Sequence, residues 1–251
     1  MTQIALITGG SRGLGRSMAQ HLAQRGVDIL FTYHSRKDEA DALVGELQAM
    51  GRKAVALQLD AGAVAGFDAF AGQVGRTLRA YWNRDDFDFL VNNAGTALYS
   101  AFADTTEEQL DAVFNIHFKG VYLLTQKLLP LIKDGGAILN ISSGLARFSY
   151  PGSSAYASMK GAIEVLTRYL AVELGPRRIR LNVLAPGAIA TDFGGGRVRD
   201  NAELNATIAG RTPLGRVGLP DDIGGAVSLL LSDEARWING QRIEASGGIH
   251  L

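Results

Sequence analysis

The chain contains no cysteine, and this absence removes several kinds of chemistry at once. A protein without thiols has no disulfide framework, no thiolate zinc site and no cysteine nucleophile. A charge excess of one sign is missing too, because 25 lysines and arginines stand against 25 aspartates and glutamates. Without a net field the chain does not select nucleic acid or an anionic membrane surface, so we expect neither as a partner.

Long hydrophobic runs are also missing, although 47% of the residues are apolar. No apolar stretch approaches the roughly 20 residues that a helix needs to span a bilayer. The first apolar run, at residues 3–7, has no basic lead and no cleavage site, and therefore does not read as a signal peptide. We expect a cytoplasmic protein with no membrane partner, which the lack of cysteine also fits.

What the sequence does have is a regular alternation of short apolar runs with segments of helical period. Runs of Val, Ile and Leu without polar alternation predict strands that are buried on both faces. Strand and helix in strict alternation predict a parallel sheet covered by helices on both sides. We therefore expect one α/β, doubly wound Rossmann domain over residues 1–251, with a seven-stranded sheet. The predicted strands are 4–8, 27–32, 54–59, 88–92, 136–142, 180–185 and 241–245. The predicted helices are 13–25, 37–50, 64–81, 107–133, 154–174 and 221–231.

Three glycines, Gly9, Gly13 and Gly15, lie between the first predicted strand and the first predicted helix. Glycine at such a junction allows a positive φ and a close approach of the backbone to a pyrophosphate. The free N–H groups of the helix start would favour the same anion. The pattern predicts a dinucleotide site, and the alternative is an ordinary glycine-rich turn.

The end of the second strand bears on the choice of cofactor. An acid there would bind the ribose diol of NAD, but residues 32–36 read Thr-Tyr-His-Ser-Arg and contain no carboxylate. Arg36, together with Arg12 in the glycine loop, could clamp a 2′-phosphate. We predict NADP(H), with NAD as the alternative if both arginines are only solvated.

Tyr156 and Lys160 are four residues apart on a predicted helix and therefore share one face. An ammonium beside a phenol favours the phenolate, so we expect the pKa of Tyr156 to fall toward working pH. Ser143 directly follows the preceding strand at the same edge of the sheet, where its hydroxyl can bond a substrate carbonyl. These three residues predict proton transfer by Tyr156, coupled to hydride transfer.

With these motifs, the chain resembles the classical subfamily of short-chain dehydrogenase/reductases over nearly its whole length, and within it the 3-oxoacyl-[acyl-carrier-protein] reductase-like members. The matching positions are Thr8-Gly9-x3-Gly13-x-Gly15, Asn92-Asn93-Ala94-Gly95, Asn115, Ser143, Tyr156, Lys160 and Pro186-Gly187. The Tyr–Lys spacing of the enoyl reductase branch is usually longer. The resemblance implies a carbonyl reductase, for example of 3-oxoacyl thioesters.

The resemblance also implies roles for single residues. Asn115 would anchor a water that relays protons from Lys160, so the expected catalytic residues are Asn115, Ser143, Tyr156 and Lys160. The expected cofactor-binding residues are Gly9, Ser11, Arg12, Gly13, Leu14, Gly15, Tyr33, Ser35, Arg36, Asp60, Ala61, Asn93, Ala94, Gly95, Tyr156, Lys160, Pro186, Gly187, Ile189 and Thr191.

Apolar residues near Ser143 predict the substrate side, namely Leu145 and Tyr150, with Phe193 from a lid at about 187–213 and Tyr99 as a further candidate. The implied assembly is a homotetramer. We expect no metal, because the four histidines show no ligand spacing. Two other functions stay open: an NAD(H)-dependent sugar or alcohol dehydrogenase, and a non-catalytic NADP sensor on the same fold.

The chain departs from the family pattern in one segment. Between Asp60 and Asn92 it is several residues longer than usual, with the extra residues around 79–86. This segment precedes a strand on the side away from the site, so we expect a surface or interface feature.

Overall fold

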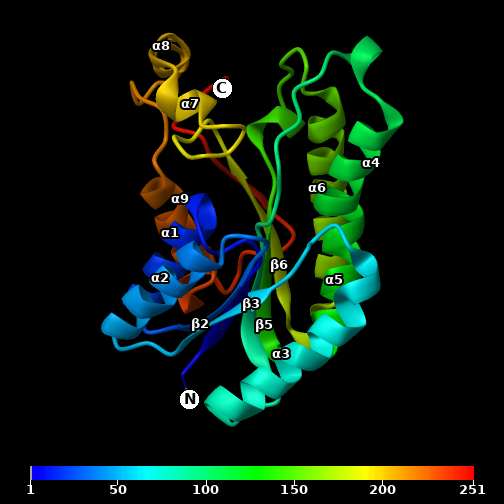
Figure 1. Cartoon of the computed structure of the whole chain (residues 1–251), viewed down its shortest axis with the longest axis vertical. Coiled ribbons are helices and arrows are strands. Elements are labelled where there is room, and N and C mark those ends of the chain that lie inside the picture. Colours follow the sequence, from blue (N-terminus) through cyan, green and yellow to red (C-terminus); the bar gives the residue numbers. More distant parts are fainter. Residues whose placement is uncertain (1) are drawn as a thin grey trace.

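In the computed structural model, which describes residues 2–251, seven strands form a single sheet in the order β3-β2-β1-β4-β5-β6-β7 (Figure 1). Every strand pair in it is parallel. The strands are β1 (Ile4–Ile7), β2 (Asp28–Tyr33), β3 (Ala54–Gln58), β4 (Phe87–Asn92), β5 (Ile132–Ile141), β6 (Arg180–Pro186) and β7 (Arg242–Ala245). The predicted α/β, doubly wound fold is confirmed.

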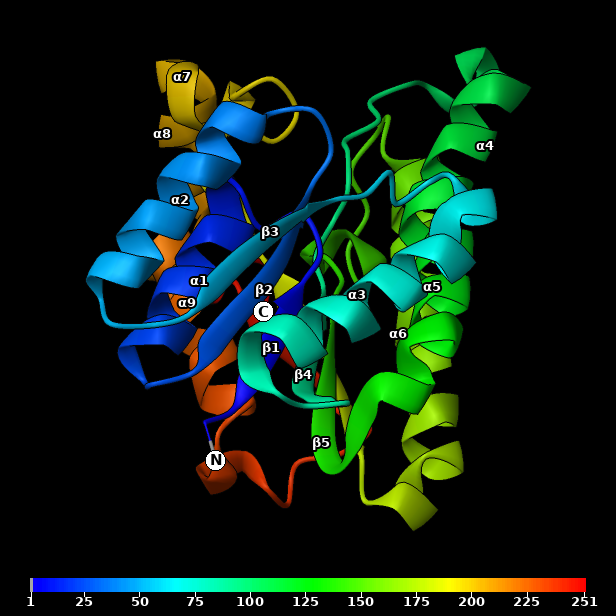
Figure 2. The same cartoon turned by 60° about the horizontal axis from the view of Figure 1, so that its bottom comes forward.

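Helices cover both faces of this sheet. The helices α1, α2 and α9 lie on one face, and α3, α4, α5 and α6 lie on the other (Figures 1 and 2). Their bounds are α1 (Gly13–Gln24), α2 (Lys37–Ala49), α3 (Phe67–Trp82), α4 (Glu107–Phe114), α5 (Gly120–Leu128), α6 (Ser154–Glu173), α7 (Arg197–Asp200), α8 (Ala202–Arg211) and α9 (Pro220–Leu230). No helix within residues 2–251 is both long and apolar enough to cross a membrane.

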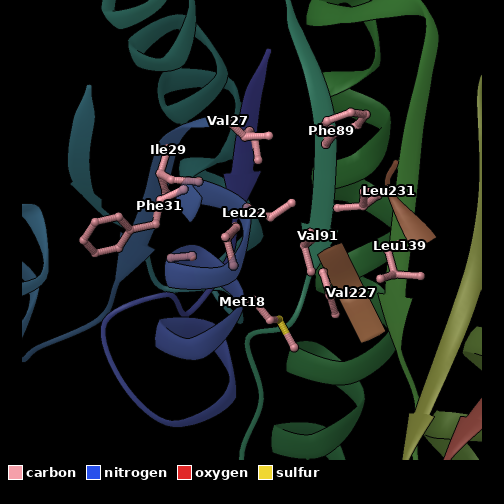
Figure 3. Close-up of a cluster of buried hydrophobic side chains, with 14 of the residues drawn as sticks. Met18, Leu22, Val27, Ile29, Phe31, Phe89, Val91, Leu139, Val227 and Leu231 are labelled. Atoms are coloured by element: carbon pink, nitrogen blue, oxygen red, sulfur yellow. The ribbon is translucent and has the colours of Figure 1, made fainter. Parts of the chain in front are cut away.

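Successive residues of the strands point into two separate cores. In β1, Ala5 and Ile7 pack with Met18 of α1, whereas Ile4 and Leu6 pack with side chains of α3 and α5. Figure 3 shows the first core, where side chains of α1 and α9 meet those of the central strands. Because both faces are buried, the strands read as continuous apolar runs. Each large buried side chain stabilises the fold by about 1.5–3 kcal/mol.

The predicted helix over 107–133 is wrong in its continuity. The structure divides it into α4, a π-helical turn η3 (Asn115–Lys119), α5 and a short 3₁₀ turn η4 (Leu129–Leu131). Pro130 has no N–H to continue the helix, and β5 begins directly afterwards at Ile132. The predicted helix over 64–81 likewise starts as a 3₁₀ turn (Val64–Gly66) before α3.

The order of the strands reverses between β1 and β4, which are neighbours in the sheet. In sheets of this kind a crevice opens at that point, outside the carboxyl ends of the strands. The helices α7 and α8, which the sequence pattern did not predict, lie beyond this same edge (Figure 1). The fold therefore directs attention to the loops that follow β1, β4, β5 and β6.

Candidate active site

The glycine loop after β1 is fixed against the loop after β4. Thr8 Oγ1 accepts hydrogen bonds from the backbone N–H groups of Asn93 and Ala94, both at 3.0 Å. Asn93 in turn donates its side-chain amide to the carbonyls of Thr8 and Gly9, at 2.9 and 3.0 Å. The two loops that flank the switch point thus form one unit.

This loop requires glycine at three positions, because Gly9 and Gly13 have a positive φ and Gly15 has no room for a side chain. Gly9 has a φ of +65°, and a Cβ on Gly15 would come within 2.2 Å of the Gly9 carbonyl. The helix α1 begins at Gly13, with no capping side chain and no acid in its first turn. Its free N–H groups therefore face the crevice without a competing carboxylate, which suits an anionic ligand such as a pyrophosphate.

Arg12 and Arg36 do not stand free at the end of β2. Arg12 pairs with Asp192 at 3.5 Å, and Arg36 pairs with Glu39 at 2.8 Å and with Asp38 at 3.4 Å. Both guanidinium groups are more than half exposed, so these pairs are weak and exchangeable. The structure brings both arginines to one edge, but it shows them bound to carboxylates of the chain.

The other predicted cofactor residues line the same edge. Thr191 is buried and lies 3.8 Å from the position of a Cβ on Gly13, and Ile189 forms an isolated bridge with Gly218. A Cβ on Gly187, which follows β6, would meet Ser246 Cα at 2.9 Å. Ser11 is buried in the glycine loop, whereas Ser35 and Asp60 are exposed and Tyr33, Leu14 and Ala61 are partly buried.

Ser143, Tyr156 and Lys160 converge at this edge. Ser143 follows β5, where its Oγ accepts from the Leu145 N–H at 3.2 Å, and its side chain lies near the hydroxyl of Tyr156 at the start of α6. Lys160 is 5% exposed; its Nζ donates to the carbonyl of Ile141 at 2.8 Å and lies 5.5 Å from the centroid of the Tyr156 ring. The three side chains thus lie together, with Lys160 buried and Ser143 and Tyr156 partly exposed toward the crevice.

Burial controls the acidity of this pair. It raises the pKa of Tyr156 well above the usual value for a phenol, against the opposing effect of the Ser143 hydrogen bond. It lowers the pKa of Lys160 to about 7. The expectation that the pKa of Tyr156 falls is therefore wrong for the protein without its ligands, because removal of the phenol from water is the largest effect on it.

A residue that sequence reasoning did not place in the site lies beside this pair. The ring of His117, in the turn η3, packs edge-on against the ring of Tyr156, with centroids 5.0 Å apart. Asn115, which was expected there, begins the same turn, and its carbonyl accepts from the Gly120 N–H. Asn115 and His117 are two residues apart, and residues two apart on a helix do not share a face. The spacing therefore indicates that only one of them can lie beside Tyr156.

The predicted substrate side is partly assembled. The ring of Phe193 lies 6.1 Å from that of Tyr156, and the guanidinium of Arg197 lies 4.8 Å from the centroid of the Tyr99 ring. A Cβ on Gly194 would touch Tyr99 at 3.0 Å, which places Tyr99 against the 187–213 segment. Tyr150 is 53% exposed and Leu145 is partly buried. Within residues 2–251 no group of three or more potential metal ligands is found.

Comparison with known proteins agrees with this geometry. The family described as enoyl-(acyl carrier protein) reductase matches residues 9–250. An uncharacterized oxidoreductase of Methylorubrum extorquens is 38% identical, over 98% of this chain and 97% of its own length. The tetrahydroxynaphthalene reductase PfmaG of Pestalotiopsis fici is 36% identical, over 98% of this chain and 91% of its own.

Among solved structures, the angucycline C-6 ketoreductase LanV with bound NADP superimposes with a TM-score of 0.93 at 32% identity, covering 98% of this chain and 95% of its own. Matches of this extent, on a chain with this sheet order, settle the family. The chain belongs to the short-chain dehydrogenase/reductases, a family of oxidoreductases.

Proposed function

We propose that this chain reduces a ketone to a secondary alcohol with NADPH, or catalyses the reverse reaction. The observation that carries the proposal is the convergence of Ser143, Tyr156 and Lys160 at the edge where the glycine loop lies. A hydroxyl donor, a partly buried phenol and a buried amine suffice to bind a carbonyl oxygen and to move one proton.

The residues of the chain have separate tasks in this mechanism. The dinucleotide supplies or accepts the hydride when it is bound. Tyr156, held neutral by burial, is in the state that donates a proton to the carbonyl oxygen during reduction. The Ser143 hydroxyl orients that oxygen. Lys160, whose pKa lies at about 7, can take up or release the proton that restores Tyr156.

The cofactor part of the proposal depends on Arg12 and Arg36. A 2′-phosphate would replace the exposed carboxylates that now pair with these side chains, and a dianion is the stronger partner. The Arg36→Ala variant should raise the KM for NADPH about tenfold and leave that for NADH within about twofold. A wild-type protein that prefers NADH would contradict the choice of NADP(H) and favour an NAD(H)-dependent alcohol dehydrogenase.

For the substrate we propose a fused-ring aromatic ketone. Tyr99 and Phe193 form an aromatic wall next to Tyr156, which suits a flat ring system better than a flexible acyl chain. Relatives named as a hydroxynaphthalene reductase and an angucycline ketoreductase support the same class. The 3-oxoacyl thioester and the sugar stay as competing predictions.

The decisive assay follows the loss of NADPH absorbance with a panel of a fused-ring ketone, a 3-oxoacyl thioester and a keto sugar. Tyr156→Phe should lower kcat by about 10²–10⁴ and leave NADPH affinity within about twofold. Tyr169→Phe, the same change at an exposed position of α6, is the control. A Tyr156 variant with wild-type turnover contradicts the mechanism. No turnover with any carbonyl, together with tight NADPH binding, would favour the sensor.

Two further expectations join the proposal. The 187–213 segment acts as a lid, since its three glycines at 194–196 all have positive φ and Phe193 and Thr191 touch opposite parts of the site.

The assembly is a homotetramer, which would cover the exposed apolar side chains Val165, Tyr169 and Val172 on α6. Light scattering in solution tests the second expectation, and a monomer contradicts it. A cytoplasmic location stays a prediction.

A further inference from the structure

His117 is buried between two parts of the active site and has no part in the proton transfer described above. It is 1% exposed and lies in the π-helical turn η3, where one extra residue per turn displaces the helix. On one side its ring meets Tyr156 edge-on, with planes at 86°. On the other side it meets the loop after β4, where a Cβ on Gly95 would lie 2.6 Å from its Cε1 atom.

The hydrogen bonds of His117 define one tautomer. Nε2 lies 2.7 Å from the carbonyl oxygen of Thr96 and 3.3 Å from its backbone nitrogen. The shorter contact requires Nε2 to carry the proton and donate it to the carbonyl. Nδ1 then bears the free lone pair, and it is buried without a hydrogen-bond partner within residues 2–251.

The charges around the ring keep it neutral. Among residues 2–251, the titratable groups that face it are Tyr156 and Lys160 of α6, and the loop after β4 presents the backbone of Gly95 and Thr96. Burial lowers the pKa of His117 to about 3, with a further contribution from the Lys160 ammonium, and the Thr96 carbonyl opposes both. Tyr156 is itself neutral because of its raised pKa.

We propose that His117 is a positioning residue that joins the loop after β4 to the Tyr156–Lys160 pair through its neutral, Nε2-protonated ring. The bond to Thr96 fixes the ring, the ring fixes the plane of the Tyr156 phenol, and Nδ1 keeps a free lone pair as an acceptor. This inference rests on the proposed function, because it assigns Tyr156 the proton transfer. The residue that lies beside Lys160 and positions Tyr156 is then His117, whereas the sequence predicted Asn115 at this place.

Two substitutions separate a polar positioning role from simple packing. An amide in His117→Asn can still donate to the Thr96 carbonyl and offer an acceptor, whereas His117→Leu fills space but does neither. We expect His117→Leu to lower kcat about 10–100-fold with the KM for NADPH within about twofold, since the phenol is misplaced and the cofactor is not. We expect His117→Asn to recover most of that loss.

The pH profile adds a readout that packing alone would not move. In alcohol oxidation Tyr156 must lose its proton, and the fixed ring of His117 keeps the phenol in the position from which Lys160 takes up that proton. His117→Leu should therefore shift the acidic limb of kcat upward by about half a unit or more. Lys119→Gln, an exposed change in the same turn, is the matched control and should keep the wild-type profile. Asn115→Ala should shift the profile less than His117→Leu does.

Three outcomes would overturn the proposal. The first is a His117→Leu enzyme with wild-type kcat and pH profile, the second is a His117→Asn enzyme as impaired as His117→Leu, and the third is a larger shift in Asn115→Ala than in His117→Leu. A wild-type protein without turnover on any carbonyl would instead contradict the proposed function.

Nitrogen NMR of the histidine rings tests the inference without turnover and in the folded wild-type protein. The chain has four histidines, so the signal of His117 is identified by its loss in His117→Asn. We expect a neutral ring with the proton on Nε2 that does not titrate between about pH 5.5 and 8. Lys160→Met should raise its pKa by removing the adjacent positive charge. An ordinary titration midpoint, or the proton on Nδ1, would refute the assignment.

Discussion

Arg84 and Lys160 are both buried cations, but they lie at opposite edges of the sheet and have different neighbours. Arg84, in the segment before β4, pairs with Asp88 at 2.7 Å and with Asp86 at 2.5 Å, and it also donates to the carbonyl of Thr2. Lys160 has no carboxylate partner within residues 2–251 and donates to the carbonyl of Ile141.

The two cations respond to burial in opposite directions. Burial lowers the pKa of Arg84, but the hydrogen bonds to Asp88 and Asp86 outweigh it and leave that pKa raised. Burial alone acts on Lys160 and brings its pKa to about 7. Arg84, at the edge of the sheet where the strands begin (the amino edge), is therefore a paired charge that stabilises the fold. Lys160, at the edge where the strands end (the carboxyl edge), has no paired carboxylate and can exchange a proton.

The largest expected effect is at the amino edge. Arg84→Met would leave the buried Asp88 with the Ile4 N–H that bonds it at 2.8 Å and with only the longer ion pair to Lys133 at 3.8 Å. We expect the free energy of unfolding to fall by about 3 kcal/mol, with kcat unchanged. Urea unfolding measures it. Arg79→Met, which breaks the exposed pair with Asp85, is the control and should cost less than about 1 kcal/mol. Equal losses in the two variants would mean that burial of the pair is irrelevant.

Lys160→Met should show the reverse pattern. Turnover should fall about 100-fold or more, because Tyr156 loses its proton exchange partner. Stability should not fall, since a methionine removes the cost of burying an amine and keeps the packing. Steady-state kinetics and urea unfolding on the same preparation measure both. If stability fell as far as in Arg84→Met, the contrast between the two edges would be wrong.

These two edges also show how far the sequence could predict the molecule. Apolar runs such as 27–32 predicted the strands because both faces of each strand are buried. The spacing of Ser143, Tyr156 and Lys160 in the sequence predicted that these residues lie close together. Spacing does not reveal burial, so the raised pKa of Tyr156 was not foreseen. The 79–86 segment, expected at the surface, does lie away from the site, but it delivers Arg84 with a side chain only 9% exposed.

The interruption of the predicted 107–133 helix also depends on packing that the local sequence pattern does not reveal. A Cβ on Gly120 would come within 2.1 Å of the Ala61 carbonyl, so the helix approaches another loop at this point. Such an approach depends on residues nearly sixty positions apart, and periodicity within the helix contains no sign of it. The place of His117 beside Tyr156 follows from that same turn.

The pH dependence of stability distinguishes Lys160 further. Its folded pKa of about 7 lies below the usual value for lysine, so between these values the unfolded chain binds the extra proton. The cost is therefore complete below about pH 7, and stability rises with pH above it, by about 1.4 kcal/mol per unit near pH 8–9. Urea unfolding of the protein without cofactor at both ends of this range measures the slope. The Lys160→Met variant should lose this rise, and a slope that survives the substitution would have to come from another group.

The smallest expected effect is also at the amino edge of the sheet, where the buried carboxylate of Asp28 is bonded by an uncharged donor. Trp82, at the end of α3, donates its Nε1–H to Asp28 at 2.9 Å, and Asp28 also accepts from the Lys53 N–H. Trp82→Phe removes one of these bonds and leaves the buried carboxylate with the other, so we expect a loss of about 1 kcal/mol in the free energy of unfolding. Tyr81→Phe, one residue earlier and 55% exposed, should change it by less than about 0.5 kcal/mol. Asp28 keeps the Lys53 N–H as a partner in this variant. A loss of stability as large as that of Arg84→Met would therefore show that packing of the Trp82 ring, and not its hydrogen bond to Asp28, stabilises this edge of the sheet.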